Sequence, residues 1–210
     1  MNLVFTMKAT SSGSIISQFA GRITAYLDHL KDHKLNPKGH KGGYLAIYHD
    51  PFGLPNEQTV GMENPIALVF LGEESDPERI SMCKSFAQEK CLRIMKNSDH
   101  RTSYESRNPE DNHWGGGLRI CFTSSKITGR IIVSFSGCPE LMDEAMIIIA
   151  AREILNSTIS YGAAMPHEPK DWLGERENPF IQILLDFEKG DSKEKGQPVT
   201  LCAPSTPIEP

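Results

Sequence analysis

The chain has 210 residues, a formal net charge of −5 at pH 7 and a pI near 5.8, and 39% of its residues are hydrophobic. This composition is typical of a globular protein with a sizeable core, on the scale of one domain with extensions. The negative net charge argues against a basic surface for binding nucleic acid or anionic membranes. No apolar run approaches the roughly 20 residues of a membrane span.

The pattern of cysteines and the first residues of the chain bear on the cellular compartment of the protein. The five cysteines are an odd number without CxxC spacing, which favours reduced thiols over a disulfide or zinc framework. Residues 3–5 are apolar but follow no basic region, so we expect no secretory signal. The sequence therefore predicts a cytoplasmic protein. Its cysteines are Cys83, Cys91, Cys121, Cys138 and Cys202.

The first part of the chain is predicted to be a helix followed by a strand. Residues 1–13 are expected to form a flexible N-terminus, and apolar residues spaced i, i+3, i+4 and i+7 predict a helix over residues 15–34. A strand is predicted at residues 43–49, with Leu45 and Ile47 on one face and Tyr44, Ala46 and Tyr48 on the other.

A buried strand, a second helix and a polar loop follow. The continuous apolar run at residues 65–71 predicts the strand, and an N-cap acid before a proline starts a helix over residues 77–97. Residues 98–113 contain almost no aliphatic side chains, and a loop of this length favours a functional role. The helix residues predicted to face water are Lys84, Gln88, Glu89 and Arg93.

The central segment is residues 112–155. A glycine triplet precedes a strand at residues 118–122, a short polar turn leads to a second strand at residues 127–135, and a helix follows at once. That helix, residues 141–155, is apolar nearly all round, so it should be buried by the sheet and by a neighbouring subunit.

The C-terminal part, residues 160–210, is predicted to be an irregular extension. Residues 160–179 are rich in proline, glycine and glutamate, and residues 180–187 favour either a strand or two helical turns docked on the body. Residues 190–210 carry four prolines and little to bury, so they predict a mobile tail.

This order of elements resembles the GlcG/HbpS-like family, the haem-binding and haem-degrading-type domain. The resemblance rests on Gly115-Gly116-Gly117 ahead of a strand and on residues 129–137, which end in Ser-Gly and lead into an acidic helix start. It covers about residues 14–156, and its specific part is about forty residues. The family's Asp-Ala-Gly-Gly turn after the first strand is replaced here by residues 49–53.

The resemblance implies a fold, a ligand and an assembly. The fold class would be α/β, a three-layer α/β/α arrangement with a central antiparallel sheet that is profilin-like, over residues 14–159. The ligand would be haem or a related tetrapyrrole, and the protein would form a homo-oligomer. No other cofactor, nucleic acid or membrane partner is expected.

The first candidate site is His113 beside Trp114. An imidazole next to a flat indole at a glycine-rich opening could act as the metal ligand to haem iron, or bind an anion together with the N–H groups of Gly115, Gly116 and Gly117. The pocket would lie between these glycines and the loop that begins at His100. The alternative is a solvated loop histidine anchored by its tryptophan neighbour.

The second candidate site is the turn Ser136-Gly137-Cys138 at the start of a helix. Its N–H groups, hydroxyl and thiol could form an anion or redox site, with the pKa of Cys138 lowered by the helix terminus. The preferred alternative is a plain strand-to-helix turn. In that case the acids that follow only compensate the helix dipole; they are Glu140, Asp143 and Glu144.

A weaker metal hypothesis concerns His29 and His33, which share a helical face at i, i+4 spacing but have no obvious third ligand. Three functions therefore stay open. The first is a ligand-binding protein, the second a non-catalytic oligomeric adaptor or assembly protein, and the third a small-molecule enzyme that uses Cys138 or His113.

Overall fold

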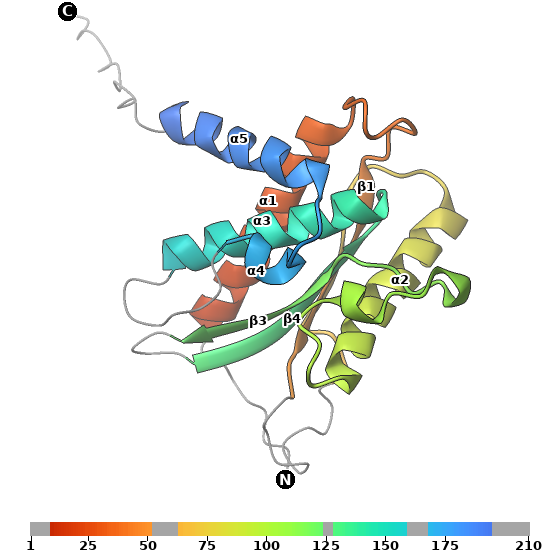
Figure 1. Ribbon diagram of the computed structural model, residues 1–210, viewed down its shortest axis with the longest axis vertical. Coiled ribbons are helices and arrows are strands. Elements are labelled where there is room, and N and C mark those ends of the chain that lie inside the picture. The colour runs from red at the N-terminus through yellow and green to blue at the C-terminus, as the bar shows by residue number, and fades with distance from the viewer. Residues whose placement is uncertain (1–8, 52–62, 124–127, 159–167, 195–210) are drawn as a thin grey trace, which may run out of the picture.

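The computed structural model of the protein describes residues 9–51, 63–123, 128–158 and 168–194 (Figure 1). Most of the predicted flexible N-terminus, most of the predicted turn at 123–126 and the predicted tail beyond residue 194 lie outside these ranges. No helix in the described ranges is long and apolar enough to cross a membrane.

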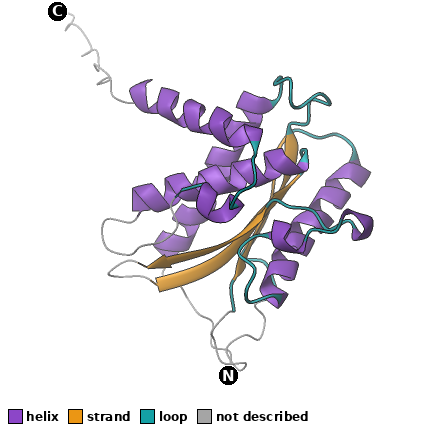
Figure 2. Ribbon diagram, viewed as in Figure 1, coloured by secondary structure: helices purple, strands orange, loops and turns teal. Residues whose placement is uncertain are grey.

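The described elements combine helices with an antiparallel sheet, which confirms the predicted α/β class (Figure 2). The strand order is β2-β1-β4-β3, and the predicted pairing of β3 with β4 is confirmed. In chain order the elements are α1 (Ala9–Leu30), β1 (Gly42–His49), β2 (Ala67–Gly72), α2 (Pro77–Lys96), the 3-10 helices η2 (Ser103–Ser106) and η3 (Pro109–Asp111), β3 (Gly117–Thr123), β4 (Thr128–Ser136), α3 (Glu140–Thr158), α4 (Lys170–Leu173) and α5 (Pro179–Glu194).

Helices cover both faces of the sheet because the strands carry apolar residues on both sides. Leu45 and Ile47 of β1 pack with α1 and α3, as the alternation in the sequence predicts. Tyr48 of β1 and Ile132 of β4 lie on the opposite face and pack with α2. In Figure 1, α2 lies on one side of the strands, and α1 and α3 lie on the other.

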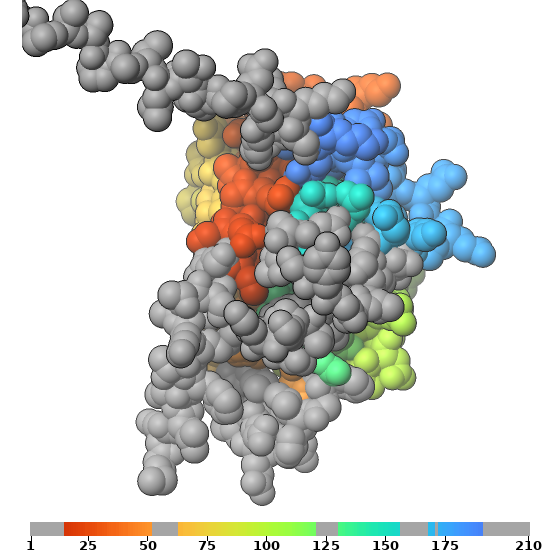
Figure 3. Space-filling model, turned by 90° about the vertical axis from the view of Figure 1, so that its left-hand side faces the viewer, coloured from red at the N-terminus to blue at the C-terminus, as the bar shows by residue number. Residues whose placement is uncertain are grey.

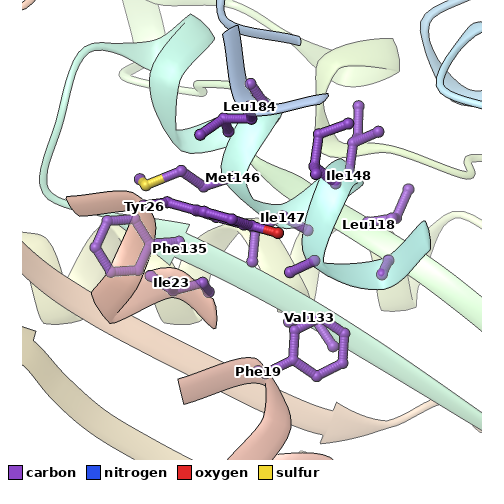
Figure 4. Close-up of a cluster of buried hydrophobic side chains, with 14 of the residues drawn as sticks. Phe19, Ile23, Tyr26, Leu118, Val133, Phe135, Met146, Ile147, Ile148 and Leu184 are labelled. Carbon is purple, nitrogen blue, oxygen red and sulfur yellow. The ribbon is translucent and has the colours of Figure 1, made fainter. Parts of the chain in front are cut away.

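Helix α3 is deeply buried, since residues 142–151 are all buried. Burial on several sides is thus confirmed, but the chain itself supplies the cover. The sheet lies under α3, Tyr26 of α1 packs beside it, and Leu184 of α5 closes it from outside (Figure 4). On the face shown in Figure 3, α1, α3 and α5 lie side by side.

The boundaries of α1 differ from the sequence prediction by four residues or more. Helix α1 begins at Ala9 rather than Ile15 and ends at Leu30 rather than Lys34. It ends early because buried Asn36 donates to the carbonyl of Leu30 at 3.3 Å and folds the chain back.

The C-terminal extension is more regular than predicted. Helix α4 lies inside the segment predicted to be irregular, and α5 runs from Pro179 to Glu194 instead of two turns or a strand. Asn178 caps α5, since its Oδ1 accepts the N–H of Phe180 at 3.1 Å. The helix is this long because its apolar side lies against the already apolar α3.

Candidate functional site

His113 lies on the strand-like segment that leads into the glycine triplet. Its backbone pairs with Asn108 through two hydrogen bonds of 2.8 and 3.0 Å, which close the short helix η3. Its side chain is 37% exposed, and Nε2 lies 3.7 Å from Oε1 of Glu89 on α2. The imidazole is thus positioned by its backbone while part of the ring stays open to solvent.

An aromatic and guanidinium cluster gathers around Trp114, the residue that follows His113. The guanidinium carbon of Arg107 lies 5.7 Å from the ring centroid of Trp114 and 5.6 Å from that of Tyr104. Nε of Arg107 also donates to both carboxylate oxygens of Glu140, at 2.8 and 2.9 Å. The cluster joins the loop before β3 to the first turn of α3, and within it the positive charge of Arg107 is balanced by the carboxylate of Glu140.

The N–H groups that the sequence offers to an anion are partly taken by the chain itself. The N–H of Gly115 donates to Oε1 of Glu140 at 2.6 Å, and that of Gly117 donates to Oγ of Ser103 at 2.9 Å. A bound anion would have to displace these partners. Glu140 is therefore a hydrogen-bond acceptor for the triplet as well as an acid at a helix start.

Gly116 allows close packing rather than lining an open space. Its φ of +98° is a backbone conformation that residues with a Cβ rarely adopt. A Cβ there would lie 2.8 Å from Cβ of Asp143 and 3.1 Å from Nζ of Lys90. The space beside this glycine is filled by two charged side chains of the same chain.

Lys90 and Asp143 form a buried ion pair that the sequence analysis missed. Nζ of Lys90 lies 3.1 Å from Oδ2 of Asp143, and the two side chains are 2% and 3% exposed. Nζ also donates to the carbonyl of Phe135 at 2.8 Å. Burial raises the pKa of Asp143 to about 6, although Lys90 and the N–H of Cys138 oppose this shift. Helical spacing was the available signal, because Lys90 follows the apolar Ala87 by three residues and so lies on the same buried side of α2.

The turn at Ser136-Gly137-Cys138 is engaged in the same packing. The carbonyl of Gly137 accepts from Nη2 of Arg79 at 2.5 Å, and the N–H of Cys138 donates to Oδ1 of Asp143 at 3.0 Å. Asp143 thus serves the helix start as expected, and it also pairs with Lys90. Ser136 is buried at the end of β4.

The predicted lowering of the Cys138 pKa is wrong in direction. Burial raises the pKa of this thiol well above its usual value, and the neighbouring Asp143 carboxylate raises it further. Sγ lies 3.8 Å from the carbonyl oxygen of His40. A thiol held protonated in this way is a poor nucleophile at neutral pH.

Two arginines hold the polar loop. Arg93, predicted to face water, is only 8% exposed, because it donates to the carbonyls of Ser103 and Trp114 at 2.7 and 2.6 Å. Arg119 donates to the carbonyl of Ile94 in the last turn of α2 at 2.8 Å and to that of His100 in the loop at 2.6 Å. These contacts give the loop a structural role that its composition did not indicate.

The structure groups most of the predicted site residues and separates one. Gly117 pairs with Ser134 across β3 and β4, and the carbonyl of Gly116 accepts the N–H of Phe135 at 3.0 Å. The glycine triplet and the 136–138 turn therefore adjoin the Lys90–Asp143 pair. His100 lies instead beyond the end of α2, where Arg119 binds its backbone.

Comparison of the chain with protein-family models, with curated proteins and with solved structures finds no match.

In the part of the chain that the structure describes, the weaker metal hypothesis for His29 and His33 gains no third ligand. The ring of His29 stacks on Phe187 of α5 with centroids 4.6 Å apart, and the ring of His33 lies 6.2 Å from that of Phe180. Within the described ranges, no group of three or more His, Cys, Asp or Glu side chains is placed to hold a metal ion.

Proposed function

We propose that the protein is a ligand-binding protein of the GlcG/HbpS-like type, with the profilin-like three-layer arrangement of that family. The ligand is haem or a related tetrapyrrole, and it contacts the outer side of His113 and Trp114. The observation that carries the proposal is the state of His113, whose imidazole is oriented by its backbone and is 37% exposed beside a half-buried indole.

The residues around His113 suit a flat, anionic macrocycle. A neutral imidazole nitrogen is an ordinary axial ligand of haem iron, and an indole offers a face on which an aromatic ring system can lie. Arg107 adds a guanidinium near Trp114, and guanidinium groups bind carboxylates such as propionates through paired hydrogen bonds. Because Glu140 already binds Arg107, a ligand carboxylate would compete with it there.

Haemin titration tests this proposal. The wild-type chain should shift the Soret band with a saturable dependence on haemin, and His113→Ala should weaken binding by about tenfold or more because one metal–ligand bond is lost. His29→Ala is the matched control, since His29 lies on α1 against Phe187. The proposal fails if the wild type shows no saturable shift, or if His113→Ala titrates like the wild type.

The second candidate function is a homo-oligomeric adaptor or assembly protein without a small-molecule ligand. The filled space beside Gly116 favours it, because glycines used for packing need no ligand. Among the described residues Cys83, Cys91 and Cys138 are free thiols, which supports the cytoplasmic location predicted from the sequence. Unchanged haemin spectra together with an intact oligomer in native mass spectrometry would favour this function over the first.

A further inference from the structure

The sheet has two edges, and the polar loop closes one of them. At the β3 edge the N–H of Arg119 donates to the carbonyl of Arg101 at 2.7 Å, and Thr102 forms a bridge with Leu118. At the other edge, β2 pairs with β1 along its inner side. Within the described ranges, no segment pairs with the outer side of β2. The backbone N–H and C=O groups on that side are therefore available to a further strand.

The sequence of β2 lacks the residues that commonly protect an edge strand from pairing. Natural edge strands often carry lysine or proline, which prevent another strand from adding to them. The segment Ala67–Gly72 contains no charged residue and no proline. Its six residues are the usual length of a strand, so β2 is long enough to pair with a second one.

The two faces of β2 offer apolar contacts to a strand that lies beside it. On the side of α1, Val69 is half-buried opposite Leu45. On the side of α2, Leu68 and Phe70 are half-buried, and the ring of Phe70 meets that of Tyr44 edge to face with centroids 5.4 Å apart. Helix α2 packs over β1, β4 and β3, so β2 lies at the margin of this layer. An added strand would remove apolar surface on both faces of β2 from water, which favours its binding.

Acidic residues at the two ends of β2 indicate which strand fits this edge. Glu63 is exposed before the strand, and Glu73 is exposed after it and pairs with Lys41. An antiparallel second copy centred on Leu68 would place Glu63 opposite Glu73 of the other chain, and like charges directly opposite each other are destabilising. A strand with a basic residue at the end that meets Glu63 would form an attractive pair there instead.

We propose that the outer side of β2 is a docking site for an extended segment of another protein, with an apolar centre and a basic residue at the end that meets Glu63. The segment pairs its backbone with that of β2 and extends the sheet by one strand. Its apolar side chains lie beside Leu68 and Phe70 on one face and beside Val69 on the other. The glycine triplet and His113 belong to the opposite edge of the sheet, so this inference does not depend on haem binding.

Binding of a capped fluorescent peptide, Lys-Val-Thr-Val-Thr-Val-Lys, to the wild-type chain tests the proposal. We expect a saturable rise in fluorescence anisotropy, and a peptide with glutamate in place of both lysines should bind at least about threefold more weakly. A peptide with proline in place of the central valine should bind at least about tenfold more weakly, because proline cannot donate to the ladder.

Nuclear magnetic resonance of the isotope-labelled wild-type chain locates the bound peptide. The lysine-flanked peptide should shift the amide signals of residues 66–72 and leave those of residues 113–117 in place. Shifts that lie outside β2 overturn the proposal, as does a wild-type chain that binds neither the lysine-flanked nor the glutamate-flanked peptide.

The variant Glu63→Lys tests the charge that selects the partner. Glu63 is exposed, so the variant should fold as the wild type does, and the ratio of its affinities for the lysine-flanked and glutamate-flanked peptides should fall by about threefold or more. The matched control is Glu110→Lys, at an exposed acid in η3, which should keep the wild-type ratio. An unchanged ratio in Glu63→Lys overturns the proposal. A wild-type dimer that the lysine-flanked peptide dissociates would assign this edge to a second copy and overturn it as well.

Discussion

Nζ of Lys90 and Oδ2 of Asp143 lie 3.1 Å apart in the interior, and they join the middle of α2 to the first turn of α3. The glycine triplet passes directly over this pair, since Gly116 has room for no side chain beside it. A buried pair of charges is costly to desolvate and is tolerated only when hydrogen bonds complete it. Here the carbonyl of Phe135 and the N–H of Cys138 complete it.

The raised pKa of Asp143 predicts how stability varies with pH. Its folded pKa is about 6 against 3.8 for the free carboxyl, so the folded state binds this proton more tightly than the unfolded state does. The associated stability is fully present below pH 3.8 and is lost as pH rises through about 6. In urea unfolding, the free energy of unfolding of the wild type should fall by on the order of 3 kcal/mol relative to that of Asp143→Asn as the pH rises through this range.

The comparison with Asp143→Asn removes the contributions of all other titrating groups, because both chains share them. If the difference in unfolding free energy between the two chains stays constant from acid to neutral pH, then burial does not raise the pKa of Asp143 in solution.

Gly116→Ala should destabilise the fold by about 2–4 kcal/mol, because it adds a Cβ at positive φ and against Asp143. Thermal or urea unfolding measures this cost. Gly21→Ala is the matched control, since Gly21 lies in α1 with no heavy atom within 4 Å of an added Cβ. That control should stabilise the helix by about 0.5–1 kcal/mol. Equal effects from the two substitutions would contradict the close packing at Gly116.

Arg119→Met should loosen the polar loop. Its guanidinium binds the carbonyls of Ile94, Asn97, Ser98 and His100 and lies 2.9 Å from Asp50. Loss of this charge should cost about 3 kcal/mol or more, because the guanidinium of Arg119 then no longer pairs with the buried Asp50 carboxylate or bonds the loop carbonyls. Hydrogen exchange should accelerate at residues 97–102 in Arg119→Met, and not in the exposed-site control Arg101→Met. Unchanged protection in both variants would contradict the structural role of Arg119.

Cys138 should react slowly with alkylating reagents in the folded protein. Its pKa is raised by burial, and each unit of increase lowers the thiolate fraction about tenfold near neutral pH. Peptide mass spectrometry of iodoacetamide-treated protein should therefore show faster labelling at Cys138 in urea than in buffer. Equal or faster labelling in the folded state would revive Cys138 as a candidate nucleophile.

The sheet and the helices α2 and α3 could be predicted from the sequence because the patterns that indicate them are local. Alternation in β1 places Leu45 and Ile47 on one face, and the all-round apolar pattern of α3 indicates burial on several sides. Asp76 and Pro77 start α2 where an N-cap followed by proline should. Such patterns depend on neighbours within a turn or a strand, so a single sequence contains them.

The buried charges could not be predicted in the same way, because their partners are distant in sequence. Asp143 lies 53 residues after Lys90, and Ser103 lies 10 residues after Arg93 across a loop. Composition alone makes Arg93 a surface residue, whereas backbone carbonyls in the loop draw it inside. The extent of α5 was missed for a related reason, since the helix is stabilised by α3 and by Glu188 contacts with α1.

A double-mutant cycle on Lys90→Met and Asp143→Asn measures the coupling free energy between the two side chains that lie beside the glycine triplet. It tests most directly whether they form a stabilising ion pair there. Lys90→Met leaves the Asp143 carboxylate buried without its cation and should cost about 3–5 kcal/mol in urea unfolding at neutral pH. The double variant should cost less than the sum, with a coupling energy of about 2 kcal/mol or more. A coupling energy within about 0.5 kcal/mol of zero would contradict the account.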